Sequence, residues 1–185
     1  MDRKYILGRD AVPAYIRLGE GESLRMTLFA PEGTSCELSL EIDLDGEGAS
    51  LDLAGGFRCL KDEKLKLRVL VRHNVPGCSS RQLFKGVVDG SANASFEGLV
   101  LVAEGAVRTV AHQEVHSLLM SSEATAQARP QLEIHADDVE CSHGATTGYL
   151  NPEELFYMRS RGIPEELARA MQTEAFLQPI ISRMA

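Results

Sequence analysis

Apolar and polar residues alternate with a period of two along most of this sequence, beginning near Ser23. In the run CELSLEIDL, the apolar side chains stand at every second position, at Leu38, Leu40, Ile42 and Leu44. Successive side chains of a strand point to opposite faces, so this spacing predicts strands rather than helices. Similar runs of roughly four to six residues recur about every eight to twelve residues, separated by clusters of Gly, Asn, Asp and Ser that indicate corners. The chain is therefore expected to be mainly β.

The pattern alone leaves two β architectures open. A sandwich needs hairpins, yet the chain offers only one typical hairpin pair, Asp89-Gly90, between alternating runs. A stacked solenoid buries the inward side chains of each coil against the coils above and below it. Small residues that would suit its crowded interior and corners are present, namely Gly98, Ala103, Gly105, Ala106 and Ala111. No strict repeat consensus can be written, so both architectures remain open at this point.

The last segment changes from strand to helix pattern. Asn151 is a suitable N-cap, and Pro152 fits the first position of a helix that ends near Gly162. Pro164 opens a second helix, with an apolar face expected at Ile163, Leu167, Met171 and Ala175. We therefore expect a β core over residues 1–150 and a helical segment over residues 151–185.

Composition excludes several classes of function. Lys and Arg number 19 against 27 for Asp and Glu, and the net charge of −8 opposes binding to nucleic acid. No run approaches the roughly 18 apolar residues of a membrane span, and the first residues lack the apolar stretch of a signal peptide. The four cysteines form no CxxC pair, which favours a reduced protein. The expectation is a cytoplasmic chain without membrane or nucleic-acid partners.

Motifs of common enzymes are incomplete. The run HQEVH, His112 to His116, has Gln113 where a zinc protease motif needs glutamate, and it lies in a strand pattern rather than a helix. GEGES and GEGAS do not extend to a phosphate-binding loop, and no GxSxG nucleophile motif occurs. We therefore expect no enzyme activity.

The run RPQLEIHADDVECSHGATTGY, Arg129 to Tyr149, holds the best candidate site. On a strand, Val139, Cys141 and His143 share one face. One interpretation is a core or corner histidine that bonds nearby backbone; the other is a metal ligand at His143, with Cys141 as the second candidate. An iron–sulfur cluster usually needs about four ligands, so any remaining ligands must come from another chain.

These residues also resemble a known family. The motifs KGVVDG, AHQ, SLLMS, RPQLEIHADDVECSHGAT and LFYMRSRGI lie between Ser80 and Ile163 in the order and spacing of the SufB/SufD family of iron–sulfur cluster assembly proteins. RHNVPGCSSRQ is a further anchor upstream. The resemblance implies a right-handed parallel β-helix followed by a short C-terminal helical segment.

The resemblance also implies partners and sites. Family members form heterodimers or homodimers of SufB/SufD-type chains and bind the SufC ATPase at their C-terminal helices. The segment from Leu150 to Phe176 would carry that contact, with partner-binding residues at Asn151, Leu155, Phe156, Tyr157, Arg159 and Arg161. His143 matches the SufD-type histidine of the dimer interface, where a nascent iron–sulfur cluster would be shared transiently. Val115 stands where SufB-type members have an essential cysteine, so the chain is similar to a short SufD.

The leading hypothesis is therefore a non-catalytic scaffold subunit that pairs with a SufB/SufD-type chain and receives a SufC-like ATPase. A free-standing metalloprotein is the first alternative, with ligands drawn from His135, Cys141, His143 and either Asp137 or Asp138. A purely structural interaction subunit is the second. The sequence does not distinguish a homodimer from a heterodimer.

Overall fold

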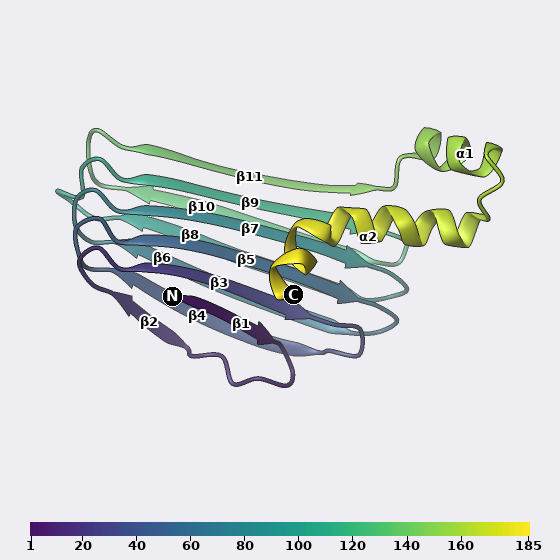
Figure 1. Cartoon of the computed structure of the whole chain (residues 1–185), viewed down its shortest axis with the longest axis horizontal. Coiled ribbons are helices and arrows are strands. Elements are labelled where there is room, and N and C mark those ends of the chain that lie inside the picture. The colour runs from purple at the N-terminus through teal and green to yellow at the C-terminus, as the bar shows by residue number, and fades with distance from the viewer.

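The computed structural model describes residues 1–185, in which eleven strands precede two helices (Figure 1). The odd-numbered strands form one parallel sheet, which we call sheet A: β1 (Asp2–Ile6), β3 (Ser23–Ala30), β5 (Ser50–Cys59), β7 (Ser79–Val88), β9 (Val110–Leu119) and β11 (Glu140–Tyr149). The even-numbered strands form the second, sheet B: β2 (Tyr15–Leu18), β4 (Cys36–Leu44), β6 (Lys64–His73), β8 (Asn93–Val102) and β10 (Thr125–Ile134). The chain thus passes from one sheet to the other after every strand.

Each coil of the chain returns to the same place one strand higher in the stack. In sheet A, Ser50 pairs with Ser79, Ser79 with Val110 and Val110 with Glu140, so successive coils take 29, 31 and 30 residues. All these pairings are parallel, which excludes the antiparallel sandwich. The predicted parallel β-helix with a C-terminal helical segment is confirmed. The predicted strand length was wrong, because each strand from β5 to β11 has 10 residues.

The core lies between the two sheets, where bulky side chains alternate with glycines one coil away. Phe84 is fully buried, and its ring occupies the space beside Gly55, where an added Cβ would lie 2.4 Å from the ring. Across the interior, the ring of Phe96 has its centroid 4.5 Å from that of Phe84. The ring of Phe57 similarly fills the space beside Gly86. These glycines are inward positions that make room for a neighbouring ring.

Helix α1 begins and ends, and helix α2 begins, where the capping pattern predicts. Helix α1 spans Pro152–Ser160, and its first turn is capped by Asn151, whose Oδ1 accepts a hydrogen bond of 2.9 Å from the amide of Glu153. Gly162, with φ of 86°, allows the chain to turn into α2, Glu165–Met184. No helix of the chain combines the length and apolar character that crossing a bilayer requires.

The predicted apolar face of the second helix was wrong. Leu167 and Met171 are 52% and 46% exposed, whereas α2 buries Ala168, Thr173, Leu177 and Ile180. Close approach to sheet A decides this orientation. At Gly56 on β5 an added Cβ would lie 2.9 Å from Ile180 Cγ2, so the helix packs against a position without a side chain.

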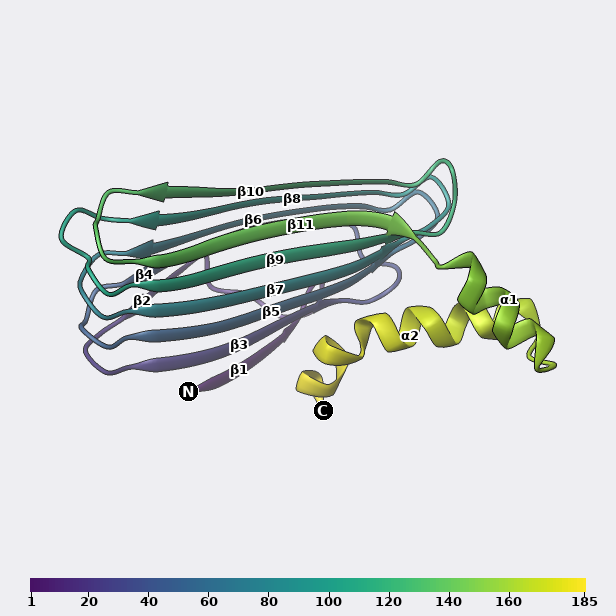
Figure 2. The same ribbon diagram turned by 90° about the horizontal axis from the view of Figure 1, so that it is seen from above.

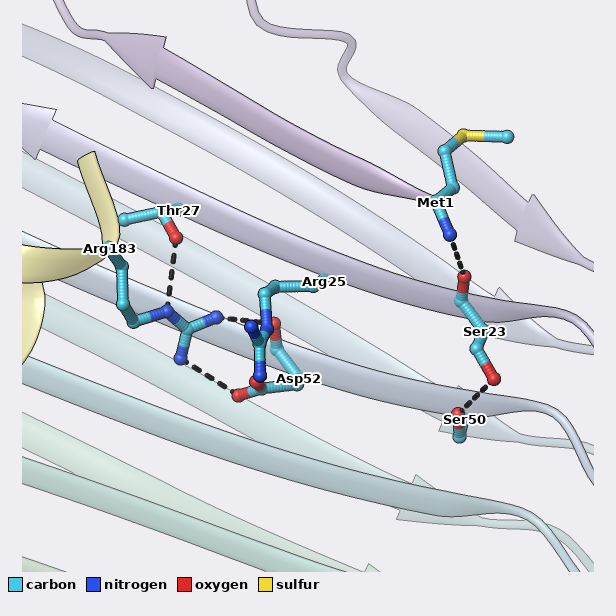
Figure 3. A network of polar contacts seen from close by, with 7 residues as sticks. All are labelled: Met1, Ser23, Arg25, Thr27, Ser50, Asp52 and Arg183. Atoms are coloured by element: carbon cyan, nitrogen blue, oxygen red, sulfur yellow. Dashed lines mark hydrogen bonds and ion pairs between the residues drawn. The ribbon is translucent and has the colours of Figure 1, made fainter. Parts of the chain in front are cut away.

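Polar contacts hold the C-terminal end of α2 on the outer face of sheet A (Figures 1 and 3). Arg183 donates to Thr27 Oγ1 at 3.2 Å, to Asp52 Oδ1 at 2.9 Å and to the Asp52 carbonyl oxygen at 3.1 Å. Arg25 also pairs with Asp52, at 3.1 Å. Further along the helix, Glu174 forms an ion pair with Arg58 of β5. Helix α2 is therefore part of the packed β structure, while α1 lies beyond the ends of the strands (Figure 2).

Candidate functional site

The last coil, formed by β10 and β11, leaves one end of the β-helix uncovered (Figures 1 and 2). Strand β11 pairs only with β9, and β10 pairs only with β8, so each keeps one free edge. Side chains of these strands that point into the interior are consequently exposed or half-buried, whereas most of their equivalents on β3 to β9 are buried. The open end therefore exposes interior-facing side chains and two unpaired strand edges.

Cys141 and His143 lie on the interior face of this open end. In the parallel ladder Cys141 pairs with Ala111 and His143 with Gln113, and both β9 partners are fully buried. Paired residues of adjacent strands point to the same side of the sheet, so their side chains form a column that runs from coil to coil. Cys141 and His143 each extend one such column of inward side chains, above Ala111 and Gln113. Alternation in the sequence predicts that Cys141 and His143 share one face of the strand, and the structure confirms this prediction.

The two residues differ in their surroundings. Cys141 is half-buried and packs beside the small apolar cluster formed by Val100, Val102, Ala106 and Ala111. Burial there raises the pKa of the Cys141 thiol, which keeps it protonated at neutral pH. His143 is exposed, because no coil lies above it. No third His, Cys, Asp or Glu side chain joins this imidazole and this thiol in a group that could hold a metal ion.

Two buried glutamines lie directly beneath His143 and were not recognised as part of a site from the sequence. Gln82 and Gln113 are 1% and 0% exposed, and Gln113 Nε2 donates to Gln82 Oε1 at 2.8 Å. In the sequence, Gln113 stands out only as the residue that breaks the HQEVH motif. A usable signal was present, because Gln113 lies between Ala111 and Val115 at an inward position of the alternation.

A second polar contact, between His73 and Ser80, lies in the interior beside the column of Gln82 and Gln113. His73 is fully buried, and its Nε2 lies 2.8 Å from the Oγ of Ser80. Burial lowers the pKa of His73 to about 4, so the ring is neutral at physiological pH. Ser80 belongs to the inward column that continues through Ala111 to Cys141. The interior beneath the open end is thus partly polar.

The structure does not assemble the ligand set of a free-standing metal site. His135 is exposed and its Nε2 lies 2.8 Å from Glu133 Oε1, while Asp137 and Asp138 are exposed at the corner before β11. Nowhere in the chain do three His, Cys, Asp or Glu side chains come together with metal-binding geometry. Of these five candidate residues, only Cys141 and His143 lie on the interior face of a strand.

The histidines of the HQEVH run face outward from strand β9. His112 Nδ1 lies 2.7 Å from Ser142 Oγ, and His116 Nδ1 lies 2.8 Å from Thr146 Oγ1, so both rings link β9 to β11. Val115, between them, points inward and is 1% exposed in the column of Phe84. The position at which the resemblance expects a SufB-type cysteine is therefore an apolar core position in this chain.

The residues predicted to bind a partner gather on α1. Phe156 and Tyr157 are 72% and 58% exposed, and the Arg161 guanidinium lies 5.1 Å from the centre of the Tyr157 ring. Arg159 forms an ion pair of 3.2 Å with Glu165 of α2. Leu155 is half-buried and Asn151 is used as the helix cap. Leu167 and Met171 of α2 extend this exposed apolar surface, which also carries charges of both signs, Arg161 and Glu153 among them.

These features define a class of protein: a parallel β-helix with a helical tail, in which a histidine and a cysteine lie at an uncovered end of the solenoid. Residues 12–176 match the family described as "SUF system FeS cluster assembly, SufBD core domain". The chain belongs to this SufBD family, as the sequence resemblance indicated.

Two curated relatives illustrate the similarity. The iron–sulfur cluster assembly protein SufD of Escherichia coli is 42% identical over 133 residues, which are 72% of this chain and 31% of the relative. An iron–sulfur cluster assembly SufBD family protein of Mycobacterium leprae is 32% identical over 188 residues, 97% of this chain and 45% of the relative. The chain thus spans about a third to a half of the length of these relatives.

Proposed function

We propose that this chain is a non-catalytic scaffold subunit of a Suf-type iron–sulfur cluster assembly complex. It pairs with a second SufB/SufD-type chain through the open end of its β-helix and binds a SufC-like ATPase through α1 and the exposed face of α2. The observation that carries this proposal is the uncovered last coil, because it presents Cys141 and His143 beside an unpaired strand edge.

The free edge of β11 is better suited to pairing than that of β10. The amide of Glu140 donates to the carbonyl oxygen of Thr109, the residue just before β9. By alternation, the amides at every second position from Cys141 therefore point to the free edge. Strand β10 carries Pro130, which has no amide hydrogen to offer. The partner chain is therefore expected to add a strand alongside β11, next to the two candidate ligands.

A proline at the free edge should separate pairing from folding. Ala145→Pro removes an amide that points to the free edge, so we expect loss of association with the partner chain and little change in melting temperature. Thr146→Pro is the matched variant, because it removes an amide bonded to β9 and should destabilise the chain by about 1–3 kcal/mol. Sedimentation and thermal melts compare the two. Unaltered association of Ala145→Pro would contradict pairing through β11.

In this assembly the cluster is cargo held between two chains. His143 supplies an imidazole nitrogen and Cys141 a thiolate once a partner or iron favours its deprotonation. The partner supplies the remaining ligands, which is consistent with the absence of a third ligand near Cys141 and His143. The cluster would be shared transiently and passed on to a recipient protein.

Replacing His143 by alanine should slow cluster formation on the assembled complex by at least about tenfold. Loss of an outer partner of a metal ligand already costs about 10–100-fold, and loss of the ligand itself should cost no less. His135→Ala is the matched control, because His135 is also exposed but lies outside the inward column. Absorbance of the forming cluster follows the rate. Equal rates for both variants would favour the purely structural subunit, and stoichiometric metal in the isolated chain would favour the free-standing metalloprotein.

The ATPase contact is proposed for the exposed side of the helices. Aromatic residues and arginines dominate the energetics of protein interfaces, and α1 presents Phe156, Tyr157 and Arg161 without any partner that buries them. Deleting the whole segment from Asn151 is a poor test, since it also removes Leu177 and Ile180 from the outer face of sheet A. Point substitutions on α1 are cleaner.

The double variant Phe156→Ala, Tyr157→Ala should weaken binding of the SufC-like ATPase by about tenfold or more, or about 1.4 kcal/mol. Its melting temperature should not change, because both side chains are exposed. Tyr15→Ala is the control, because Tyr15 is an exposed aromatic residue that lies on β2, away from the helices. Titration calorimetry or pull-down measures the affinity. Wild-type affinity of the double variant would place the contact elsewhere.

A further inference from the structure

The buried glutamines form a short amide ladder along the interior of sheet A. Residues Gln82, Gln113 and His143 occupy consecutive positions of one inward column, on β7, β9 and β11. Two polar atoms of the ladder are buried without a hydrogen-bond partner, Gln82 Nε2 and Gln113 Oε1. Buried polar atoms are rarely left unpaired, so each one calls for an explanation.

The two unpaired atoms are the two ends of the ladder. In a column of stacked amides, each NH₂ donates to the carbonyl oxygen on one side, and each carbonyl oxygen accepts from the other side. Gln113 Nε2 donates to Gln82 Oε1, so the free Gln113 Oε1 is the acceptor for the next position in the column. That position is His143. At the opposite end, Gln82 pairs with Leu53, which has no acceptor in its side chain.

The free acceptor is not in contact with bulk solvent. Gln113 Oε1 has less than 1 Å² of accessible surface, so water does not reach it from outside. His143, by contrast, is exposed, and its side chain can rotate toward the column below. A neutral imidazole carries one N–H donor, which matches the one free acceptor.

We propose that Gln113 is a positioning residue for His143: its Oε1 accepts a hydrogen bond from one ring nitrogen of His143 and thereby leaves the other nitrogen unprotonated and directed to the open end. This inference rests on the proposed function for its role in cluster assembly, where His143 is a ligand. Metal-binding histidines commonly donate their second ring N–H to a fixed acceptor, which sets the tautomer and the orientation of the ring.

Gly98 on the opposite sheet makes the ladder possible. An added Cβ at Gly98 would lie 2.6 Å from Gln113 Nε2, from Gln113 Oε1 and from Phe96 Cε1, so the amide and the edge of this ring share the space that the glycine leaves. Gly98 pairs with Pro130 and Val69 and lies on β8, away from His143. Gly98→Ala should therefore displace the amide of Gln113 together with the edge of the Phe96 ring, while every residue of sheet A keeps its identity.

The tautomer of His143 tests the proposal directly in the isolated full chain. With ¹⁵N-labelled histidines at about pH 8, where an ordinary imidazole is neutral, NMR distinguishes the protonated from the unprotonated ring nitrogen. His143→Ala assigns the signals among the five histidines. We expect one dominant tautomer of His143 in the wild type, and in Gln113→Met a shift to the populations of the urea-unfolded chain.

Controls separate a positioning role from a loss of stability. Ser80→Ala removes another buried hydrogen bond, that with His73, and should leave the His143 tautomer unchanged. Gly98→Ala should reproduce the effect of Gln113→Met, and it serves as the test if Gln113→Met does not fold. The proposal is overturned if folded Gln113→Met, or folded Gly98→Ala, keeps the wild-type tautomer populations, or if Gln113 proves to donate to an unprotonated His143 nitrogen.

The assembled complex distinguishes this inference from the proposed function. If both hold, Gln113→Met slows cluster formation by about 10–100-fold, as loss of an outer ligand partner does elsewhere. If the Gln113–His143 hydrogen bond forms but His143 is not a ligand, Gln113→Met changes the tautomer. Both Gln113→Met and His143→Ala then assemble clusters at the normal rate. If only the ligand role holds, His143→Ala fails and Gln113→Met changes neither the tautomer nor the rate.

Discussion

Phe84→Ala is expected to lower the free energy of unfolding by about 3–5 kcal/mol, the range typical of a fully buried aromatic side chain cut back to alanine. The ring lies beside Gly55 and against Phe96, 4.5 Å between centroids, so no neighbouring side chain can easily fill the cavity. For a chain of this size the melting temperature should fall by roughly 10 °C. Urea unfolding and thermal melts measure both quantities.

Phe156→Ala provides the control for this prediction. The same chemical change on exposed α1 should alter stability by no more than about 0.5 kcal/mol. A loss below about 1 kcal/mol for Phe84→Ala would mean that the two sheets can close over the missing ring, contrary to the packing described above.

Because of His73, the free energy of unfolding should fall by up to about 3 kcal/mol between neutral pH and pH 4. Its pKa is lowered to about 4 by burial in the folded chain, against about 6.5 in the unfolded chain. Between these values the unfolded chain binds more protons, so acid favours unfolding. The contribution of His73 is therefore complete above about pH 6.5 and is lost as the pH falls toward 4.

The acid effect is isolated by comparison with His73→Gln, which keeps a polar side chain but does not titrate in this range. We expect the wild type and the variant to diverge in their pH dependence only below about pH 6.5, with the flatter curve in the variant. Parallel curves from pH 7 to pH 4.5 would show that His73 is hydrated or already paired when charged.

The local part of the fold could be predicted from the sequence. Alternation at Leu38, Leu40 and Ile42 indicated strands, and Asn151 and Gly162 indicated the limits of α1, because these signals depend on neighbouring residues. Strand length could not be predicted in the same way. Gly55 and Gln82 interrupt the apolar pattern at inward positions, and their compatibility with the core depends on residues one coil away.

The candidate site also has a part that could be predicted from local sequence and a part that could not. The shared face of Cys141 and His143 follows from alternation and was predicted, whereas the open end and the ladder beneath it depend on pairing between strands 30 and 31 residues apart. The exposed face of α2 was missed because helix periodicity does not reveal that Gly56 lets Ile180 approach the sheet. Long-range parallel pairing leaves no local signal of this kind.

Helix α2 changes how the solenoid responds to stress. Coils of a solenoid normally depend only on their nearest neighbours, so that each can unfold almost independently. Because α2 packs across β3, β5 and β7 and is tied to Asp52 by Arg183, these coils gain a common partner and become one cooperative unit. The coil of β10 and β11 has a neighbour on one side only, so it can open locally while the rest of the molecule stays folded.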